Sequence, residues 1–317
     1  MLSKEEIKLN KLEYIKLKVT LKCMEDCILP AYLGSTLRGA IGRELKKLSC
    51  MSPKQADCRK CANTHLCCYT KVFSSVTNEH DGWGKATNAL PNPFIIEPPM
   101  DCKRDYYAGE NLCFNLIFIG DGISYLPYFI FAVNGMAVNG LGVSRKKFAL
   151  EGVERFDTGE SIFINGVFDH TAVKLTKWED KTYEGKVDEV SVKFLTPFRF
   201  RLDGKMYDSL NFEIFLRNIL RRMSMLASCY CGGEWQINYK DLLEKSRTIA
   251  VKRLNTEWHD WERYSSRIQG KVKMGGIVGE VVFKGKLSPF LPYINIGSAL
   301  HIGKGCTMGL GKYEYKT

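Results

Sequence analysis

The chain ends in a glycine-rich run that constrains its fold more than any other feature. Residues 301–313 read HIGKGCTMGLGKY and contain two Gly-x-Gly steps, at Gly303 and Gly309. Glycine tolerates positive φ and has no side chain, so such a run can bring backbone N–H groups close to phosphates. A dinucleotide-binding fold places its glycine loop after the first strand and opens a helix with it. Here the residues that follow predict a last β-strand, so the phosphates of a polymer fit better than a nucleotide cofactor.

The charge of the chain points the same way. Its 46 basic and 35 acidic residues give a formal net charge of +11, which favours association with a polyanion. The alternative is a basic surface that only aids solubility. No stretch approaches the roughly 20 apolar residues of a membrane span, and residues 1–6 lack the apolar run of a signal peptide. We therefore expect a cytoplasmic protein without a membrane partner.

Four of the twelve cysteines lie close together in a polar segment. Their spacing is C-x7-C-x2-C-x5-C, and they are Cys50, Cys58, Cys61 and Cys67. In a reducing compartment such thiols are more readily metal-bound than paired. The CxxC step fits a structural zinc ion, which would order a segment that has little core of its own. The full spacing is not that of a standard zinc ribbon, so an iron–sulfur cluster and an unmetallated loop stay open.

The first half of the chain predicts a ferredoxin-like domain. Residues 12–22 alternate apolar and polar as a strand does, and residues 32–48 carry apolar side chains at helical spacing. The remaining predicted elements are a short strand at 69–74, strands at 94–97, 111–120 and 148–153, and a helix at 126–138. The order β-α-β-β-α-β is ferredoxin-like. With a hairpin at 155–186, this domain spans 1–186 and contains the cysteine-rich loop 50–68.

The second half predicts another α+β domain of similar layout, at 187–317, without a literal internal repeat. Its elements are a strand at 188–196, the longest helical pattern at 208–228, a short helix after 232–233, a glycine-punctuated hairpin at 275–285 and the terminal strand. The glycine-rich loop, 303–311, comes just before that last strand.

Six stretches, in this order, resemble the CRISPR-associated RAMP endoribonucleases of the sixth Cas family. They are LRGAIGR at 37–43, CYTKVF at 68–73, VKFLTPFR at 192–199, LRRMSML at 220–226, WERYSSR at 261–267 and the glycine signature at 301–311. The resemblance implies an α+β protein with two tandem ferredoxin-like (RRM-like) domains and a C-terminal glycine-rich loop. It also implies that the protein cleaves precursor CRISPR RNA within each repeat.

The family's reaction needs no metal or other cofactor. The ribose 2′-hydroxyl attacks the adjacent phosphate and leaves a 2′,3′-cyclic phosphate and a 5′-hydroxyl. Such a reaction requires a proton acceptor, a proton donor and a cation beside the phosphorane. In relatives these roles fall to a histidine after the first helix, a lysine soon after it and a polar residue within the helix. The corresponding residues here are His65, as general base or acid, and Lys71 and Arg38, which would stabilise the phosphate.

Several of these assignments have alternatives. His65 lies between Cys61 and Cys67, so it could instead be a metal ligand or a solvated loop residue. Some members of the family use no histidine, and Tyr32, Lys46 or Lys47 would then carry the proton transfer. His301 is a rival because it adjoins the glycine loop.

The remaining site residues are those expected to contact RNA, mostly through phosphates. They are Gly303, Lys304, Gly305, Gly309, Gly311, Lys312, His301, Arg43, Arg221, Arg222, Arg263 and Arg267.

Two other classes of function compete with the endoribonuclease. A non-catalytic RAMP subunit would hold guide RNA in a CRISPR effector complex without proton-transfer groups. A metal-stabilised RNA-binding module, or an enzyme with a nucleotide cofactor, fits the end-of-chain loop less well. The helix at 32–48 with His65 and Lys71 beyond it favours the enzyme. Its expected partners are repeat RNA and effector-complex subunits, and both a monomer and a homodimer stay open.

Overall fold

The computed structural model describes residues 12–53, 57–74, 90–178, 185–202, 205–206, 209–265 and 270–317. They form two compact units. The N-terminal unit comprises Glu13–Thr176 and Cys229–Cys231, and the C-terminal unit comprises Met1–Leu12, Lys177–Ser228 and Gly232–Thr317. Among the helices within these ranges, none is long and apolar enough to cross a membrane.

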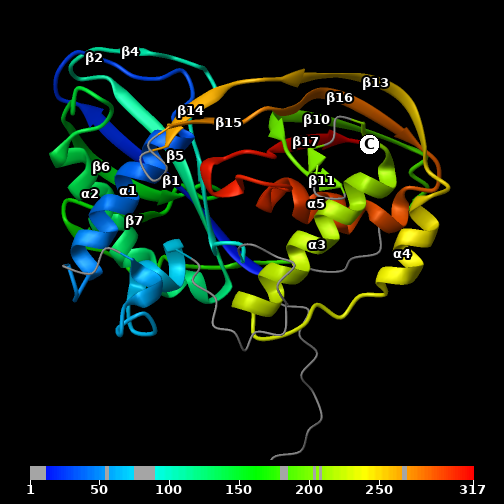
Figure 1. The fold of residues 1–317 in the computed structure, drawn as a ribbon, viewed down its shortest axis with the longest axis horizontal. Coiled ribbons are helices and arrows are strands. Elements are labelled where there is room, and N and C mark those ends of the chain that lie inside the picture. Colours follow the sequence, from blue (N-terminus) through cyan, green and yellow to red (C-terminus); the bar gives the residue numbers. More distant parts are fainter. Residues whose placement is uncertain are drawn as a thin grey trace, which may run out of the picture. The chain divides into compact units, whose positions relative to one another are not determined.

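The N-terminal unit is built on an antiparallel sheet with strand order β3-β5-β1-β6-β7-β8 (Figure 1). Its strands are β1 (Glu13–Cys23), β3 (Phe94–Glu97), β5 (Asn111–Ile119), β6 (Phe148–Arg155), β7 (Ser161–Ile164) and β8 (Val167–Phe168), with β9 (Thr176–Lys177) beside β1. The helices are α1 (Gly34–Ser49) and α2 (Leu126–Asn139), preceded by η3 (Gly120–Tyr125). A two-stranded pair, β2 (Cys27–Ile28) and β4 (Asp105–Tyr106), lies apart from the sheet. The order β3-β5-β1-β6 is that of a ferredoxin-like domain, as predicted.

The core of this unit explains why the predicted strand at 12–22 and the predicted helix at 32–48 formed. Alternate residues of β1, from Ile15 to Leu21, are buried, and the helical stripe Leu37, Ile41 and Leu45 of α1 packs in the same core. Burying one face of a central strand against one face of a helix fixes the register of the strand and the rotation of the helix about its own axis.

One predicted strand is wrong. Residues 69–74 form a π-helical segment, η2 (Tyr69–Ser74), after the short η1 (Cys58–Lys60). The Thr70 hydroxyl donates to the carbonyl of Cys67 at 2.8 Å, and the Lys71 N–H donates to the same carbonyl at 3.1 Å. Aromatic and β-branched residues favour strands on average, but these local hydrogen bonds give the backbone a helical alternative.

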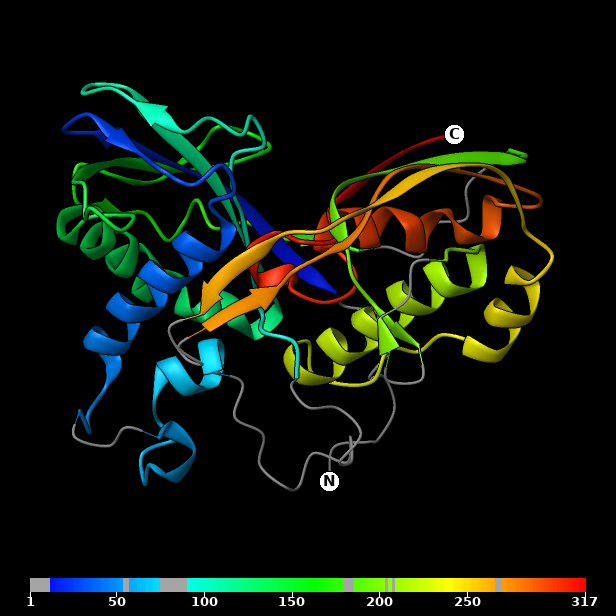
Figure 2. The same ribbon diagram turned by 45° about the horizontal axis from the view of Figure 1, so that its top comes forward.

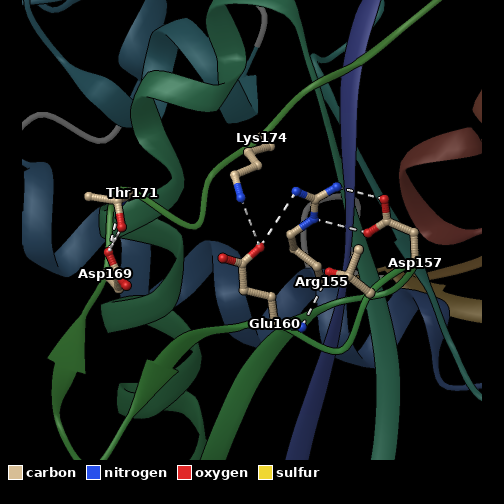
Figure 3. Close-up of polar contacts among 7 residues, drawn as sticks. Arg155, Asp157, Glu160, Asp169, Thr171 and Lys174 are labelled. Atoms are coloured by element: carbon tan, nitrogen blue, oxygen red, sulfur yellow. Dashed lines mark hydrogen bonds and ion pairs between the residues drawn. The ribbon is translucent and has the colours of Figure 1, made fainter.

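A polar network closes the turn between β6 and β7 (Figure 3). The buried Arg155 donates to both carboxylate oxygens of Asp157, at 3.0 and 2.6 Å, and lies 3.8 Å from Glu160. Lys174 reaches the same Glu160 at 3.5 Å. The bidentate pair satisfies a guanidinium that the core would otherwise leave without acceptors.

The C-terminal unit has a second antiparallel sheet with order β13-β16-β10-β17 (Figure 2). Its strands are β10 (Glu189–Phe198), β13 (Ala250–His259), β16 (Gly276–Lys284) and β17 (Tyr313–Lys316), and its helices are α3 (Phe212–Tyr230), α4 (Tyr239–Ser246) and α5 (Leu291–Leu300). Shorter elements are the pairs β11 (Arg201–Leu202) with β12 (Lys205–Met206) and β14 (Glu262–Ser265) with β15 (Gly270–Lys273), and the turns η4 (Ser288–Phe290) and η5 (Cys306–Met308). This order repeats that of the first unit, so the tandem ferredoxin-like fold is confirmed.

Packed aromatic rings join the sheet to α3. Phe215 of α3 contacts Phe194 of β10 and Phe283 of β16, with ring centroids 6.0 and 5.6 Å apart. The Tyr313 hydroxyl donates to Ile294 of α5 at 2.7 Å. Both helices therefore bury their apolar faces against the sheet.

Two features of this unit differ from the sequence prediction. Residues 275–285 do not form a hairpin, since they contribute the single strand β16. Gly279 has a φ of 103° and lies against the backbone of Asn255, so this glycine marks a close approach of β13 instead of a turn. Strand β13 itself was missed, because nearly all of its residues are exposed and give no alternating pattern.

Candidate functional site

The glycine-rich loop needs its glycines for its own backbone path. Gly303, Gly305, Gly309 and Gly311 have φ values of 80°, 83°, 85° and 71°, a region that strains other residues. A side chain at Gly303 would collide with the carbonyl oxygen of Arg199, and one at Gly311 with that of Ile302. The loop is therefore packed against its own chain and against the residues that follow β10.

Most described N–H groups of the loop are already used inside the protein. The backbone N–H of Ile302 donates to the carbonyl of Gly311 at 3.1 Å, and that of Gly311 donates to the carbonyl of Pro197 at 3.1 Å. The backbone N–H of Lys304 donates to the carbonyl of Arg199 at 2.7 Å. The N–H groups of Met308, Gly309, Leu310 and Lys312 also have intramolecular acceptors. These amides cannot serve phosphates as the sequence suggested. Ligand contact is left mainly to side chains, of which that of Lys304 is exposed.

His301 does not fit the role predicted for it. Its side chain is fully buried, at 0% exposure, and its Nδ1 lies 3.1 Å from the carbonyl oxygen of Leu310. The ring thus ties the end of α5 to the far side of the loop. A buried ring cannot contact RNA, so we assign His301 a structural part and remove it from the candidate binding residues.

Five cations gather beside the loop, and we call them the cationic cluster. They are Arg199 after β10, Arg201 in β11, Arg221 in α3, Arg263 in β14 and Lys304. Partial burial, and then Arg201, Arg221 and Arg199, hold the pKa of Lys304 below its ordinary value. The pKa of Arg199 is likewise lowered by burial and then by Arg201 and Arg263, with Asp260 opposing. The five charges therefore repel one another at close range.

The cluster has hydrogen-bond donors to spare. Within the described residues none of its members forms an ion pair, and the Nε atoms of Arg199 and Arg263 are buried without an acceptor. Arg199 spends its other nitrogens on the Lys273 carbonyl and the Met274 sulfur, both at 3.0 Å. Those two buried atoms are out of reach of a ligand, but the side chains of Arg201, Arg221 and Lys304 are exposed and suited to phosphate oxygens.

The sheet of the same unit is electrostatically different. Arg253 of β13 pairs with Glu280 of β16 at 2.9 Å, and Lys252 pairs with Glu189 at 2.5 Å. Lys193 stands opposite Glu280 on one side and Glu314 on the other. These three strand cations thus lie beside carboxylates, which the members of the cationic cluster do not pair with in the described residues.

The other predicted RNA contacts fall in different places. The Arg222 guanidinium donates to the carbonyl of Leu300 at 3.1 Å, where a cation stabilises the C-terminus of α5. Arg222 therefore holds the helix end that leads into the loop. Lys312 is half-buried. Arg43 is exposed on α1, and its pKa is lowered by partial burial and by Arg145. Arg267 lies outside the described residues.

In the N-terminal unit, α1 and η2 bring two predicted catalytic residues onto one pair of rings. Tyr69 and Phe73 stack with centroids 5.4 Å apart. The Arg38 guanidinium lies 4.4 Å from the Phe73 centroid and donates to the Phe73 carbonyl at 3.4 Å, and Lys46 Nζ lies 5.9 Å from the Tyr69 centroid. Gly42 stands between them on the helix, and a side chain there would come within 2.5 Å of the Phe73 ring.

Tyr69 is a residue of this site that the sequence reasoning missed. Burial raises the pKa of its phenol, as does Cys58, while Lys46 and Arg38 lower it. The ring is therefore near both cations. The available signal was the spacing of Tyr69 and Phe73, which stacks two rings only in a helical segment.

The remaining catalytic candidates lie around this pair without being part of it. His65 is exposed on the turn between η1 and η2, Lys71 is exposed on η2, and Tyr32 is half-buried before α1. Their roles stay predictions.

The four clustered cysteines line a single cavity of about 20 Å³. We call it the cysteine cavity; its other lining residues are Lys46, Met51, Ser52, Asn63, Tyr69 and Thr70. As the described side chains stand, no three His, Cys, Asp or Glu residues are spaced to hold a metal ion.

Two ferredoxin-like units in tandem, the second carrying a glycine-rich loop before its last strand, are the architecture that the resemblance implied. Two family models match the chain. A model described as an N-terminal domain, AF_1859_N, matches residues 12–177, and the model of the CRISPR-associated endoribonuclease Cas6 matches residues 192–313. By these matches the chain is an RNA-cleaving enzyme whose residues 192–313 form a domain of the CRISPR-associated endoribonuclease Cas6. The resemblance drawn from its motifs is confirmed.

Solved structures share the fold over most of the chain. A Cas6 product complex matches with a TM-score of 0.59 and 16% identity, over 96% of this chain and 100% of that one. Cas6 of Thermus thermophilus matches with 0.54 and 15%, over 96% and 99%. A partial Cas6-RT-Cas1–Cas2 complex matches with 0.56 and 14%, over 96% of this chain and 46% of that one. No curated protein sequence matches.

Proposed function

We propose that the protein cuts precursor CRISPR RNA within the repeat, without a metal, by attack of the ribose 2′-hydroxyl on the adjacent phosphate. The products are a 2′,3′-cyclic phosphate and a 5′-hydroxyl. The observation that carries the proposal is the cationic cluster, because it offers unpaired arginines beside the glycine loop of an endoribonuclease-family protein. Cas6 structures that share the fold include a product complex, which supports repeat RNA as the ligand.

The chemistry needs no external nucleophile, since the RNA itself supplies the 2′-oxygen. The protein must take the 2′ proton, give a proton to the 5′ oxygen and stabilise the charge that grows on the phosphorane. We assign Arg38 and Lys71 to that charge, as the family resemblance implies, and add Lys46, which the sequence named only as an alternative proton shuttle. Arg38 is fixed over the Phe73 ring by a cation–π contact and a hydrogen bond, so little reorganisation is required of it during the reaction.

Proton transfer is assigned to His65, with Tyr32 as the alternative. His65 and Lys71 are exposed and so accessible to RNA. Attachment to other CRISPR effector subunits, and action as a monomer or as a homodimer, remain predictions of the family resemblance.

The test uses end-labelled repeat RNA under single-turnover conditions, with EDTA present. We expect one cut, a 2′,3′-cyclic phosphate on the upstream product, and no cleavage of RNA that carries a 2′-deoxy sugar at the cut. Lys46→Gln should slow the cut by about 10²-fold or more with RNA affinity changed much less. Lys47→Gln distinguishes the two neighbouring lysines: Lys47 already pairs with Glu44 at 2.8 Å, so we expect this variant to cut at nearly the unaltered rate.

RNA that is bound but left intact would contradict the proposal and support a guide-RNA scaffold. Equal rates for Lys46→Gln and the unaltered protein would remove Lys46 from the site.

A further inference from the structure

The cysteine cavity is formed by three separate pieces of backbone. Cys50 follows the last turn of α1, Cys58 begins η1 and Cys61 follows it, and Cys67 precedes η2. All four line the same cavity of about 20 Å³, a volume suited to one water-sized group. Cys68, adjacent in sequence, belongs instead to the hydrophobic core. Convergence of these four thiols is an observation independent of their spacing in the sequence.

The backbone around the cavity is held in place by hydrogen bonds to the cysteines themselves. The Thr64 hydroxyl donates to the carbonyls of Cys58 and Cys61 at 2.8 and 2.6 Å, and the Cys61 N–H donates to Cys58 at 3.3 Å. The Thr70 hydroxyl donates to the carbonyl of Cys67 at 2.8 Å. These bonds turn the chain back on itself in a segment that contributes little to the apolar core.

We propose that Cys50, Cys58, Cys61 and Cys67 bind one zinc ion as thiolates. Four sulfur ligands in a tetrahedron are the donor set of structural zinc, and the CxxC step is a common zinc spacing. Binding forms four S–Zn bonds and releases four thiol protons to solvent, with no change of oxidation state. The thiols must turn further into the cavity to reach the ion, and Cys67 gives up its 3.8 Å contact with the carbonyl of Ser49.

The surroundings suit such a centre. Four thiolates around Zn²⁺ carry two excess negative charges, and the Lys46 side chain lines the same cavity to offset part of them. The ion would join the end of α1 to η1 and η2. It would thereby fix the backbone that carries Tyr69 and Lys46 without touching the RNA.

The first experiment is metal analysis of the full chain, purified under reducing conditions without chelator. We expect about one zinc ion per chain. The double variant Cys58→Ser/Cys61→Ser should retain less than about 0.2 equivalents. Cys102→Ser is the matched control, since Cys102 is exposed and away from the cavity, and it should keep the zinc.

A second experiment avoids variants that fail to fold. The unaltered protein, stripped of metal and reduced, is titrated with Co²⁺, which should give the intense visible bands of tetrahedral thiolate coordination. Zinc should then displace the Co²⁺, which abolishes the bands, and should protect four thiols from a thiol reagent. Protein that contains no zinc and takes up neither ion overturns the proposal, as does equal zinc in the double variant. A chromophore with bound iron would overturn it in favour of an iron–sulfur cluster. Neither readout depends on RNA cleavage.

Discussion

Lys304 illustrates how a residue's neighbours set its chemistry. It is the exposed side chain of a loop whose amides are largely engaged, and three arginines stand near it. Their repulsion, added to partial burial, destabilises its ammonium form. A bound phosphate would reverse the sign of that local field. The ammonium form of Lys304, which is destabilised without a ligand, is thus stabilised once an anion is bound.

This gives a pH prediction for binding. Because the pKa of Lys304 lies below its ordinary value, its charge is complete at low pH and is lost as pH rises through the lowered pKa, earlier than for an ordinary lysine. RNA affinity should fall by up to about 10-fold across that alkaline range. Lys304→Arg should remove the decline, because arginine stays charged. Fluorescence anisotropy at constant ionic strength measures it, and parallel declines for both proteins would refute it.

Sequence reasoning could identify individual cations but not which of them lie close together in the fold. Lys304, Arg221 and Arg263 were picked from motifs, whereas Arg199 and Arg201 join them only because β10 ends beside the loop. His301 shows the converse. Its position near the glycines suggested an RNA contact, and the fold of the loop placed its ring in the core.

At the scale of elements, η2 packs against α1 along one narrow stripe of the helix. Residues 38, 42 and 46 are four apart, so they recur on the same side of α1. The middle one is glycine, and the Phe73 ring occupies the space that a side chain would take. A single missing methyl group therefore determines how closely the aromatic pair approaches the helix.

Gly42→Ala tests that packing. Alanine favours a helix over glycine by about 0.5–1 kcal/mol, but here its Cβ would meet the Phe73 ring at 2.5 Å. We expect a net loss of about 1–3 kcal/mol in the free energy of unfolding, measured by urea denaturation, and slower RNA cleavage because Arg38 moves with the ring. Gly39→Ala is the control: nothing lies within 4 Å of its Cβ, so it should stabilise the protein. A stable and fully active Gly42→Ala protein would contradict the packing argument.

The elements that the sequence predicted well are those with one buried and one exposed face, such as β1 and α1. Strand β13 was missed because exposure on both sides leaves no periodic signal. Segment 69–74 was assigned to the wrong class because the Thr70 hydroxyl and the ring pair outweighed intrinsic preference.

For the whole molecule, the net charge of +11 predicted a polyanion partner without saying where it binds. The structure separates paired from unpaired charge. Some strand cations, such as Arg253, form ion pairs with carboxylates, while no member of the cationic cluster forms an ion pair within the described residues. The sequence predicted a second α+β half of similar layout although no literal repeat exists, but its strand order could not be predicted because β13 was missed.

This separation predicts the salt dependence of RNA binding. Removing one phosphate contact to single-stranded RNA should lower the slope of log K against log salt by about 0.7. We expect that change for Arg201→Gln and again for Arg263→Gln. Arg253→Gln should leave the slope unchanged, because Glu280 already neutralises that charge at 2.9 Å. Three variants with the same slope as the unaltered protein would show that the cluster does not bind RNA.

The self-bonded glycine loop has a consequence for the thermodynamics of association. Its amides and carbonyls are bonded to one another and to the chain after β10, so its shape does not depend on a ligand. A loop ordered in advance loses no backbone entropy when it is occupied, and its ligand contacts are not offset by the cost of ordering it. A ligand that docks there therefore meets a preformed rigid surface, and the flexibility that remains to be lost is that of the RNA.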